Sequence, residues 1–318
     1  MSPGTHDALS DPRNEEVVIN INGELIARPE AKISVFDSGF LVGDGVWEAM
    51  RLHDDVLVYL DLHLDRLFQG AKAIHMDIGK TRQELSDALY ATVHANGMQN
   101  NVHARMMITR GIKKTPSQDP RLVVGGPTIV IIAEHKVADP STTTAGIRLF
   151  TSTVRRGSPD YLDPRLNCHS KLHEVIALAQ ALEAGADEAL MLDIHGFVST
   201  CNATNFFVVR GEEVWTSTGQ YCMNGITRGK VIEVGRRDGL TVHEKNFSLT
   251  DVYDADEAFV TGTFGGLTPV IEIDGRAIGS DTMGPITRHL RELYHKDVQL
   301  AVQETVAARK QQSTHAAK

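Results

Sequence analysis

The chain has 318 residues, and 42% of them are hydrophobic, which supplies enough apolar side chain for two ordinary cores. The formal net charge of -9 argues against nucleic-acid binding, because nucleic-acid binders usually concentrate Lys and Arg on one face. Three cysteines without CxxC spacing suggest neither a disulfide framework nor a zinc site, and they are typical of a cytoplasmic protein. The sequence shows no basic leader and no uncharged apolar run of about 18 residues, so we expect no membrane contact.

The first part of the chain, residues 15–134, has the pattern of an α+β domain. The pair Asn22–Gly23 stands between two apolar runs and predicts a β-hairpin. Apolar residues recur at helical spacing after residue 60, and Thr81 with Glu84 forms a capping box that predicts the start of a second helix. Further strands are expected at residues 46–52 and 102–110.

A linker and a second, larger domain follow. Residues 135–146 (HKVADPSTTTAG) lack apolar periodicity and predict an interdomain linker. In the second domain, residues 147–302, a helix is expected from about Lys171 to Ala184, with Leu172, Val175, Ile176, Ala179 and Leu182 on one face. Short strands are expected at 188–193, 205–209, 213–215 and 258–262, and helices near Thr227 and Pro285. Residues 1–14 and 303–318 are polar and small, which predicts terminal tails.

Two turns have the composition of anion-binding sites. The run Asn224–Arg228 is a Gly turn followed by a helix start, so its free amides and the Thr227 hydroxyl could hold a phosphate dianion. The run Thr261–Gly266 ends a strand with hydroxyls and glycines, which suits close approach of the backbone to an anion. Either turn by itself is more often an ordinary turn with a capping Thr. No GxxxxGK[ST], GxSxG or HExxH signature is present, which excludes several enzyme classes.

Taken in order, a series of motifs resembles the class IV aminotransferases over about residues 20 to 290. The motifs are VFDSGFLVGDGVWEAMR (35–51), LHLDRL (62–67), ITRG (108–111), GADEALMLD (185–193), GFVSTCNATNFFVV (196–209), NGITRGKV (224–231) and FVTGTFGGLTPV (259–270). The resemblance implies the two-domain fold of D-amino acid aminotransferases, with a smaller N-terminal α+β domain and a larger C-terminal domain. It also implies pyridoxal 5′-phosphate as the cofactor.

The resemblance assigns the phosphate of that cofactor to four residues. Arg66 lies in the HxxRL element, and a guanidinium suits a phosphate because it donates two parallel bonds. The amides of Ile226 and Thr227 at a helix start, together with Thr263, complete the expected phosphate site.

The reaction needs a lysine that forms a Schiff base and shuttles a proton, and we assign Lys171 to it. Lys171 is the only lysine between Lys136 and Lys230, and Ser170 before it could cap a helix. One departure is visible here: when the following helix is aligned without gaps, the family lysine falls on Asn167, four residues earlier. Four residues are about one helical turn, so a long side chain could still reach the cofactor.

A second departure concerns the cofactor ring. Where the family has a glutamate that pairs with the pyridine nitrogen, this chain has Thr200. A hydroxyl can hydrogen-bond the nitrogen but cannot supply a counter-charge, so we expect a weaker electron sink and a more labile cofactor.

On the substrate side, the resemblance points to two groups of residues. Arg105 in His103-Ala104-Arg105 is similar to the Tyr-x-Arg of branched-chain enzymes, and its guanidinium could receive a substrate carboxylate. The alternative for Arg105 is a solvated or salt-bridged strand residue. The remaining expected pocket residues are Phe36, Trp47, Phe264 and Gly265.

The leading hypothesis is therefore a transaminase that passes an amino group from a small donor to a 2-oxo acid, with a branched-chain L-amino acid as the first choice. A D-amino acid or (R)-amine donor stays open, as does a lyase of the aminodeoxychorismate type. A cofactor-binding protein without turnover is a further alternative, because both the lysine position and the glutamate are altered. The family also implies a homodimer.

Overall fold

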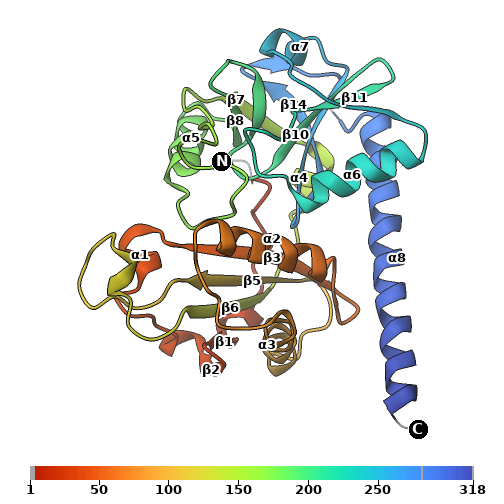
Figure 1. The fold of residues 1–318 in the computed structure, drawn as a ribbon. Coiled ribbons are helices and arrows are strands. Elements are labelled where there is room, and N and C mark those ends of the chain that lie inside the picture. Colours follow the sequence, from red (N-terminus) through yellow and green to blue (C-terminus); the bar gives the residue numbers. More distant parts are fainter. Residues whose placement is uncertain (1–3, 281, 317–318) are drawn as a thin grey trace. The chain divides into compact units, whose positions relative to one another are not determined.

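The computed structural model describes residues 4–280 and 282–316, and these form two compact units. We call the unit of Ser10–Val137, Asn167–Ser170 and Leu300–Lys318 the N unit. The C unit contains Met1–Leu9, Ala138–Leu166 and Lys171–Gln299. Each unit has its own sheet, in agreement with the expected two-domain α/β fold (Figure 1).

The N unit is built on a six-stranded sheet in the order β2-β1-β6-β5-β3-β4. The predicted hairpin is confirmed, because Asn22 and Gly23 both have positive φ, 54° and 94°, between β1 and β2. The capping box of Thr81 and Glu84 is also confirmed at the start of α3. The elements are η1 (Pro12–Glu15), β1 (Val18–Ile21), β2 (Glu24–Ala27), η2 (Arg28–Glu30), α1 (Ser38–Val42), β3 (Gly45–His53), β4 (Val56–Leu57), α2 (Leu60–Ala73), α3 (Arg82–Ala95), β5 (Val102–Thr109), η3 (Pro120–Leu122) and β6 (Thr128–His135).

The two faces of this sheet carry different side chains. Residues alternate along β3, so Val46, Glu48 and Met50 point to one face and Trp47 to the other. The first face packs against α2 and α3, whose apolar residues share one core cluster with Val46 and Met50. The other face carries the side chains of Trp47 and Arg105, because the register pairs Trp47 with Met107 and Ala49 with Arg105. The core and the expected substrate residues therefore lie on opposite faces of the same strands.

The C unit is built on a nine-stranded mixed sheet. Its main path is β12-β11-β10-β13-β14-β7-β8-β9, and β15 pairs with β14. Phe207 and Phe259 stack in its core with ring centroids 4.8 Å apart. The elements are α4 (Pro140–Ala145), β7 (Ile147–Thr151), α5 (Leu172–Glu183), β8 (Glu188–Leu192), β9 (Val198–Cys201), β10 (Asn205–Arg210), β11 (Glu213–Thr216), α6 (Ile226–Arg237), β12 (Thr241–Glu244), α7 (Leu249–Tyr253), β13 (Glu257–Gly262), β14 (Gly266–Ile273) and β15 (Arg276–Ala277), with α8 (Pro285–Ala316) continuing into the residues of the N unit.

Helix α5 is where predicted but is oriented differently from what its apolar pattern suggests. Its buried residues are Glu174, Ala177 and Ala181, whereas Leu172 and Val175 are exposed by 71% and 59%. Alanine allows a close approach to β8, where Ala177 and Ala181 pack in one cluster with Met191. The larger apolar side chains consequently point outward from the C unit.

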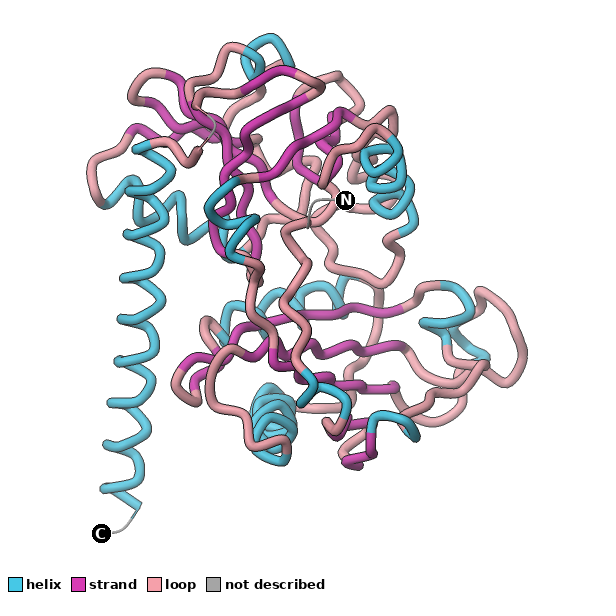
Figure 2. Tube along the Cα trace, turned by 180° about the vertical axis from the view of Figure 1, so that it is seen from behind, coloured by secondary structure: helices cyan, strands magenta, loops and turns pink. Residues whose placement is uncertain are grey.

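The expected tails and linker are more structured than predicted. Thr5 is 4% exposed and belongs to the C unit, although we placed residues 1–14 in a tail. Helix α8 continues to Ala316, in place of a tail from residue 303, since Ala, Gln, Lys and Arg there are good helix formers (Figure 2). The predicted linker 135–146 contains the short helix α4. Among the described residues, no helix has the length and apolar character needed to cross a bilayer.

Candidate functional site

The first predicted anion site is the start of helix α6. Gly225 occupies the N-cap position without a side-chain cap, so the first amides of the helix, including those of Ile226 and Thr227, have no capping side chain. The loop that leads into the helix is fixed by Asn205, whose Oδ1 accepts from Gly225 N at 3.2 Å and whose Nδ2 donates to Met223 O at 2.9 Å. A rigid helix start with uncapped amides is a suitable site for an anion.

The second predicted anion site lies beside the first within the C unit. Thr261 of β13 is paired in register with Asn205, the residue that fixes the α6 loop. The Thr261 Oγ1 is buried and has no hydrogen-bond partner, which is unusual for a buried hydroxyl. The strand then turns through Thr263, Phe264 and Gly265 into β14. The structure thus brings together both sets of residues that the sequence singled out.

Thr200 lies close to the same group of residues. It is 4% exposed, and its Oγ1 donates to the backbone O of Thr204 at 2.8 Å. Asn205 Nδ2 lies 3.3 Å from the same Oγ1 and donates to it. The hydroxyl proton of Thr200 is therefore already engaged, so a ring nitrogen could receive it only if this bond to Thr204 broke.

Arg66 on α2 belongs to a buried charged group in the N unit. Its Nε and one terminal nitrogen donate to the two carboxylate oxygens of Glu48 at 2.6 and 2.8 Å. His63 Nδ1 lies 2.7 Å from the same carboxylate, which is 0% exposed. Burial opposes ionisation of Glu48, but the hydrogen bonds of Arg66 and His63 outweigh it and lower its pKa. The guanidinium is thus held in a fixed orientation by Glu48.

The position where the family lysine aligns is occupied by a well-anchored residue. Asn167 O accepts from Trp47 N at 3.0 Å, and Asn167 Nδ2 donates to Trp47 O at 2.7 Å. The next two residues also contact β3: Cys168 forms an isolated β-bridge with Val46, and His169 N donates to Gly45 O at 3.0 Å. Asn167 Oδ1 is buried without a hydrogen-bond partner. Residues 167–169 are therefore hydrogen-bonded to β3, with one isolated β-bridge at Cys168.

Lys171 itself is the N-cap residue of α5, and Ser170 does not cap that helix as we predicted. Ser170 Oγ donates instead to Gly43 O at 3.3 Å. Lys171 Nζ lies 3.5 Å from Glu174 Oε1, an oxygen that also accepts from Arg156 at 2.8 Å. Burial works against the ionised form of Glu174, but its basic neighbours lower its pKa to about 2. The Lys171 amine therefore faces a carboxylate, and it must leave this ion pair to act as a nucleophile.

The expected substrate residues of the N unit divide into two places. The Arg105 guanidinium lies 4.3 Å above the Trp47 ring, and no carboxylate among the described residues forms an ion pair with it. Desolvation lowers the pKa of Arg105. His103 is buried two residues before it on the same face of β5. Phe36, by contrast, is 42% exposed in the loop before α1. In the C unit, Phe264 is buried and Gly265 is partly exposed.

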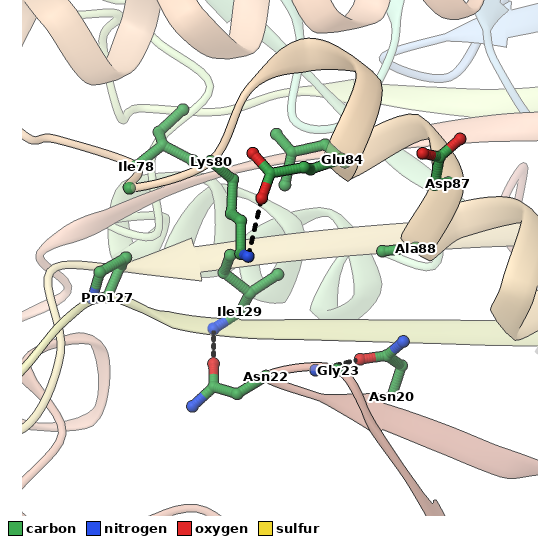
Figure 3. A pocket seen from close by; sticks show the side chains of 12 residues that line it. Asn20, Asn22, Gly23, Ile78, Lys80, Glu84, Asp87, Ala88, Pro127 and Ile129 are labelled. Atoms are coloured by element: carbon green, nitrogen blue, oxygen red, sulfur yellow. Dashed lines mark hydrogen bonds and ion pairs between the residues drawn. The ribbon is translucent and has the colours of Figure 1, made fainter.

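A pocket of about 380 Å³ in the N unit lies outside these groups of residues (Figure 3). Its polar groups already have local partners, since Asn20 Oδ1 accepts from Gly23 N and Asn22 Oδ1 accepts from Ile129 N. Lys80 pairs with Glu84 at 2.9 Å at its edge. We assign no chemistry to this pocket.

Sequence reasoning missed three residues of the described groups: Glu48, Asn205 and Glu174. Glu48 stands in a strand of otherwise apolar inward residues, and a carboxylate at such a position signals a buried cation partner. Asn205 and Glu174 gave no comparable signal, because Asn205 bonds to the distant backbone and the buried partner of Glu174, Arg156, is eighteen positions away.

Comparison with known proteins identifies the family. Residues 45–273 match the model of the family described as amino-transferase class IV. The chain is 40% identical over 291 residues to the branched-chain-amino-acid aminotransferase-like protein 2 of Arabidopsis thaliana, covering 91% of this chain but 52% of that protein. It is also 40% identical to a putative branched-chain-amino-acid aminotransferase of Methanocaldococcus jannaschii, covering 88% and 96%. The chain belongs to the class IV aminotransferases.

A solved structure agrees with this assignment. The branched-chain aminotransferase of Thermoproteus uzoniensis with norvaline superimposes with a TM-score of 0.79 at 29% identity, over 89% of this chain and 94% of that one. The chain thus spans about half the length of the plant relative and nearly all of the two archaeal ones.

Proposed function

We propose that this chain is a pyridoxal-5′-phosphate-dependent aminotransferase that takes the amino group of a branched-chain L-amino acid and passes it to a 2-oxo acid. The observation that carries the proposal is the uncapped start of α6 beside the buried, unpartnered Thr261 hydroxyl. Membership of the class IV family and the names of its relatives support the donor class.

The residues of the C unit fit the phosphate and the ring of this cofactor. The amides of Ile226 and Thr227 and the hydroxyl of Thr263 would hold the phosphate, and Thr261 offers a buried hydroxyl in need of a partner. Arg66 is assigned to the same phosphate by family resemblance, with Glu48 setting the direction of its guanidinium. Thr200 would face the ring nitrogen. Bound pyridoxal phosphate supplies an aldehyde that accepts amino groups and a ring that withdraws electrons.

At the aldehyde end we assign Lys171 as the amine that attaches the cofactor and moves a proton at the substrate Cα. Asn167 has no amine, and it is fixed to Trp47 through its backbone and its side chain. Lys171 leaves its ion pair with Glu174 in this role, while Arg156 stays as the partner of that carboxylate.

On the substrate side we assign Arg105 to the carboxylate, because its guanidinium is oriented by the Trp47 ring and, among the described residues, it feels the charge of Glu134 without forming an ion pair. The Trp47 ring and His103 would border the donor side chain on the same face of the sheet. Phe264 and Gly265 are assigned to the substrate pocket by family resemblance.

We also propose that the chain works as a homodimer in a reducing compartment such as the cytoplasm. The N unit exposes apolar residues around α1 and the loops that pair with it: Ile33, Val35, Phe36, Phe40, Val42, Ile112 and Val124. Such a group of exposed apolar side chains is typical of a protein interface. The three cysteines are buried and free, which suits a reducing environment.

The test is reduction of the cofactor-loaded protein with borohydride, followed by peptide mapping of the labelled lysine. We expect the label on Lys171, its loss in Lys171→Ala, and no change in Lys230→Ala. Adding Asn167→Lys to Lys171→Ala asks whether an amine at the family position restores the label. A label on any other lysine would refute the Lys171 assignment, and a wild-type protein that takes up no cofactor would refute the proposed function.

The donor is then tested on the loaded protein with L-leucine, D-alanine and (R)-1-phenylethylamine, each with 2-oxoglutarate. We expect bleaching of the cofactor absorbance and product formation with L-leucine. A response only to one of the other two donors would move the assignment to the D-amino acid or (R)-amine class. Pyruvate released from aminodeoxychorismate without an acceptor would identify a lyase, and uptake without turnover of any donor would identify a binding protein.

A further inference from the structure

The strongest feature outside the assigned residues is a fully buried carboxyl group in the C unit. Glu188 on β8 is 3% exposed, and no cation pairs with it among the described residues. Its two oxygens instead accept from two hydroxyls, Thr5 Oγ1 and Thr204 Oγ1, the latter at 2.7 Å. Burial without a cation favours the neutral, protonated acid, and it outweighs the two accepted hydrogen bonds, which favour the ionised form.

The two threonines lie close to the turn that we assign to the phosphate. A methyl group placed on Gly262 would lie 3.4 Å from Thr204 Cγ2, which is ordinary contact distance. A methyl group placed on Gly265 would lie 3.6 Å from the backbone O of Thr5. Glu188 thus bridges two residues that flank the same turn at its two ends.

Thr204 also connects this group to the ring end of the site. Its backbone O accepts from Thr200 Oγ1 at 2.8 Å and from Cys201 N at 2.9 Å. A displacement of Thr204 would therefore disturb both the turn at Gly262 and the hydroxyl assigned to the ring nitrogen.

Thr5 belongs to a short ordered segment, residues 4–9, which we call the strap. It is held by a bridge between Ala8 and Ala138 and by a bond from Gly4 N to Asp7 Oδ2 at 2.7 Å. Thr5 is its buried residue, whereas His6 and Asp7 are exposed. The strap therefore reaches the interior of the C unit through the Thr5 contact with Glu188.

We propose that Glu188 is a positioning residue, which, together with Thr5 of the strap and with Thr204, holds the Thr261–Gly266 turn in the shape that receives the cofactor phosphate. This inference rests on the proposed function for the identity of the ligand. The link between the strap, the carboxyl group and the turn does not depend on the proposed function.

The link is sensitive to pH near neutrality. Burial raises the pKa of Glu188 to about 7, against the lowering effect of the bonds from Thr204 and Thr5, and nearby Asp187 raises it further. Asp187 itself lies 3.8 Å from Arg148, and Cys201 is the other titratable group beside Glu188. Above pH 7 the carboxyl group ionises in a site without a cation. Each threonine bond to the carboxylate then strengthens, but the cost of the buried charge is relieved when the strap opens to water, so the turn should open more readily.

The experiment combines two readouts on the full chain: pyridoxal phosphate affinity by absorbance titration, and amide hydrogen exchange of residues 261–266, corrected for intrinsic rates. In the wild type, the affinity for pyridoxal phosphate should weaken about tenfold from pH 6 to pH 8 if only the protein with neutral Glu188 binds the cofactor. Glu188→Gln, which keeps a neutral group of the same shape, should weaken far less over this range. The control Glu84→Gln makes the same change in a carboxyl with a pKa of about 2, and should follow the wild type.

Variants at the strap separate positioning from general stability. Thr5→Val should weaken affinity about fivefold at pH 6, the loss of one hydrogen bond, and should speed exchange in the turn. Thr5→Ser keeps the hydroxyl and should restore both readouts. The proposal is overturned if Thr5→Val and Glu188→Gln match the wild type in exchange of the turn at pH 6 and pH 8. If exchange responds as expected but the wild type takes up no pyridoxal phosphate at any pH, the link stands and the proposed function fails.

Discussion

Replacing Glu188 by Gln should make the protein's stability less dependent on pH. The folded protein holds this carboxyl with a pKa raised from 4.5 to about 7, so between those values the unfolded chain releases a proton that the folded chain keeps. Stability therefore falls as pH rises through this range, and the loss is complete above pH 7. The full effect corresponds to about 3 kcal/mol, of which about 2.5 kcal/mol develops between pH 5 and pH 8.

Thermal unfolding at pH 5 and pH 8 measures this effect. The melting temperature of Glu188→Gln relative to the wild type should rise by about 5 °C between pH 5 and pH 8. Glu84→Gln is the matched control, because the pKa of Glu84 lies at about 2 and its ionisation is complete at both pH values. A constant difference between Glu188→Gln and the wild type would show that Glu188 is ionised throughout and would refute the reasoning.

Three further changes test the other groups of residues. Arg66→Met leaves the buried carboxylate of Glu48 with His63 alone and should cost about 3–5 kcal/mol in chemical denaturation, with part of the loss recovered by adding Glu48→Gln. Arg105→Leu should raise KM for amino acid donors with a smaller effect on kcat, and it should affect a carboxylate-free amine little, so an equal effect on both donors would contradict the assignment. Thr200→Glu should slow cofactor loss on dialysis, since a carboxylate pairs with a protonated ring nitrogen; an unchanged rate of loss would count against Thr200 facing that nitrogen.

The sequence predicted the features that depend on local chemistry. The positive φ values of Asn22 and Gly23 and the capping box of Thr81 and Glu84 follow from neighbouring residues alone, and both were found as expected. The helix start at Ile226 and the turn after Thr261 were located for the same reason. Each needs only a glycine, a hydroxyl and the end of a strand or the start of a helix.

The features that were missed depend on contacts between distant residues. Thr5 contacts Glu188 across 183 positions, and nothing in the local pattern of residues 4–9 marks them as ordered. The orientation of α5 was missed because periodicity identifies an apolar face but not the surface against which it packs. The pair of Lys171 with Glu174, three positions away, is local, but the burial of Glu174 against Arg156, eighteen positions before it, could not be read from the sequence.

The division of the chain between its two units has a consequence for biosynthesis. The chain passes from one unit to the other after residues 9, 137, 166, 170 and 299, so neither unit is a continuous stretch of sequence. The strap leaves the ribosome before β8 and cannot bury Thr5 until Glu188 has been made, and the N unit is incomplete until the residues after 299 appear. No single cut in the gene yields either unit whole. In a nascent chain arrested before α8, the N unit and the C unit should therefore both still be open to proteases.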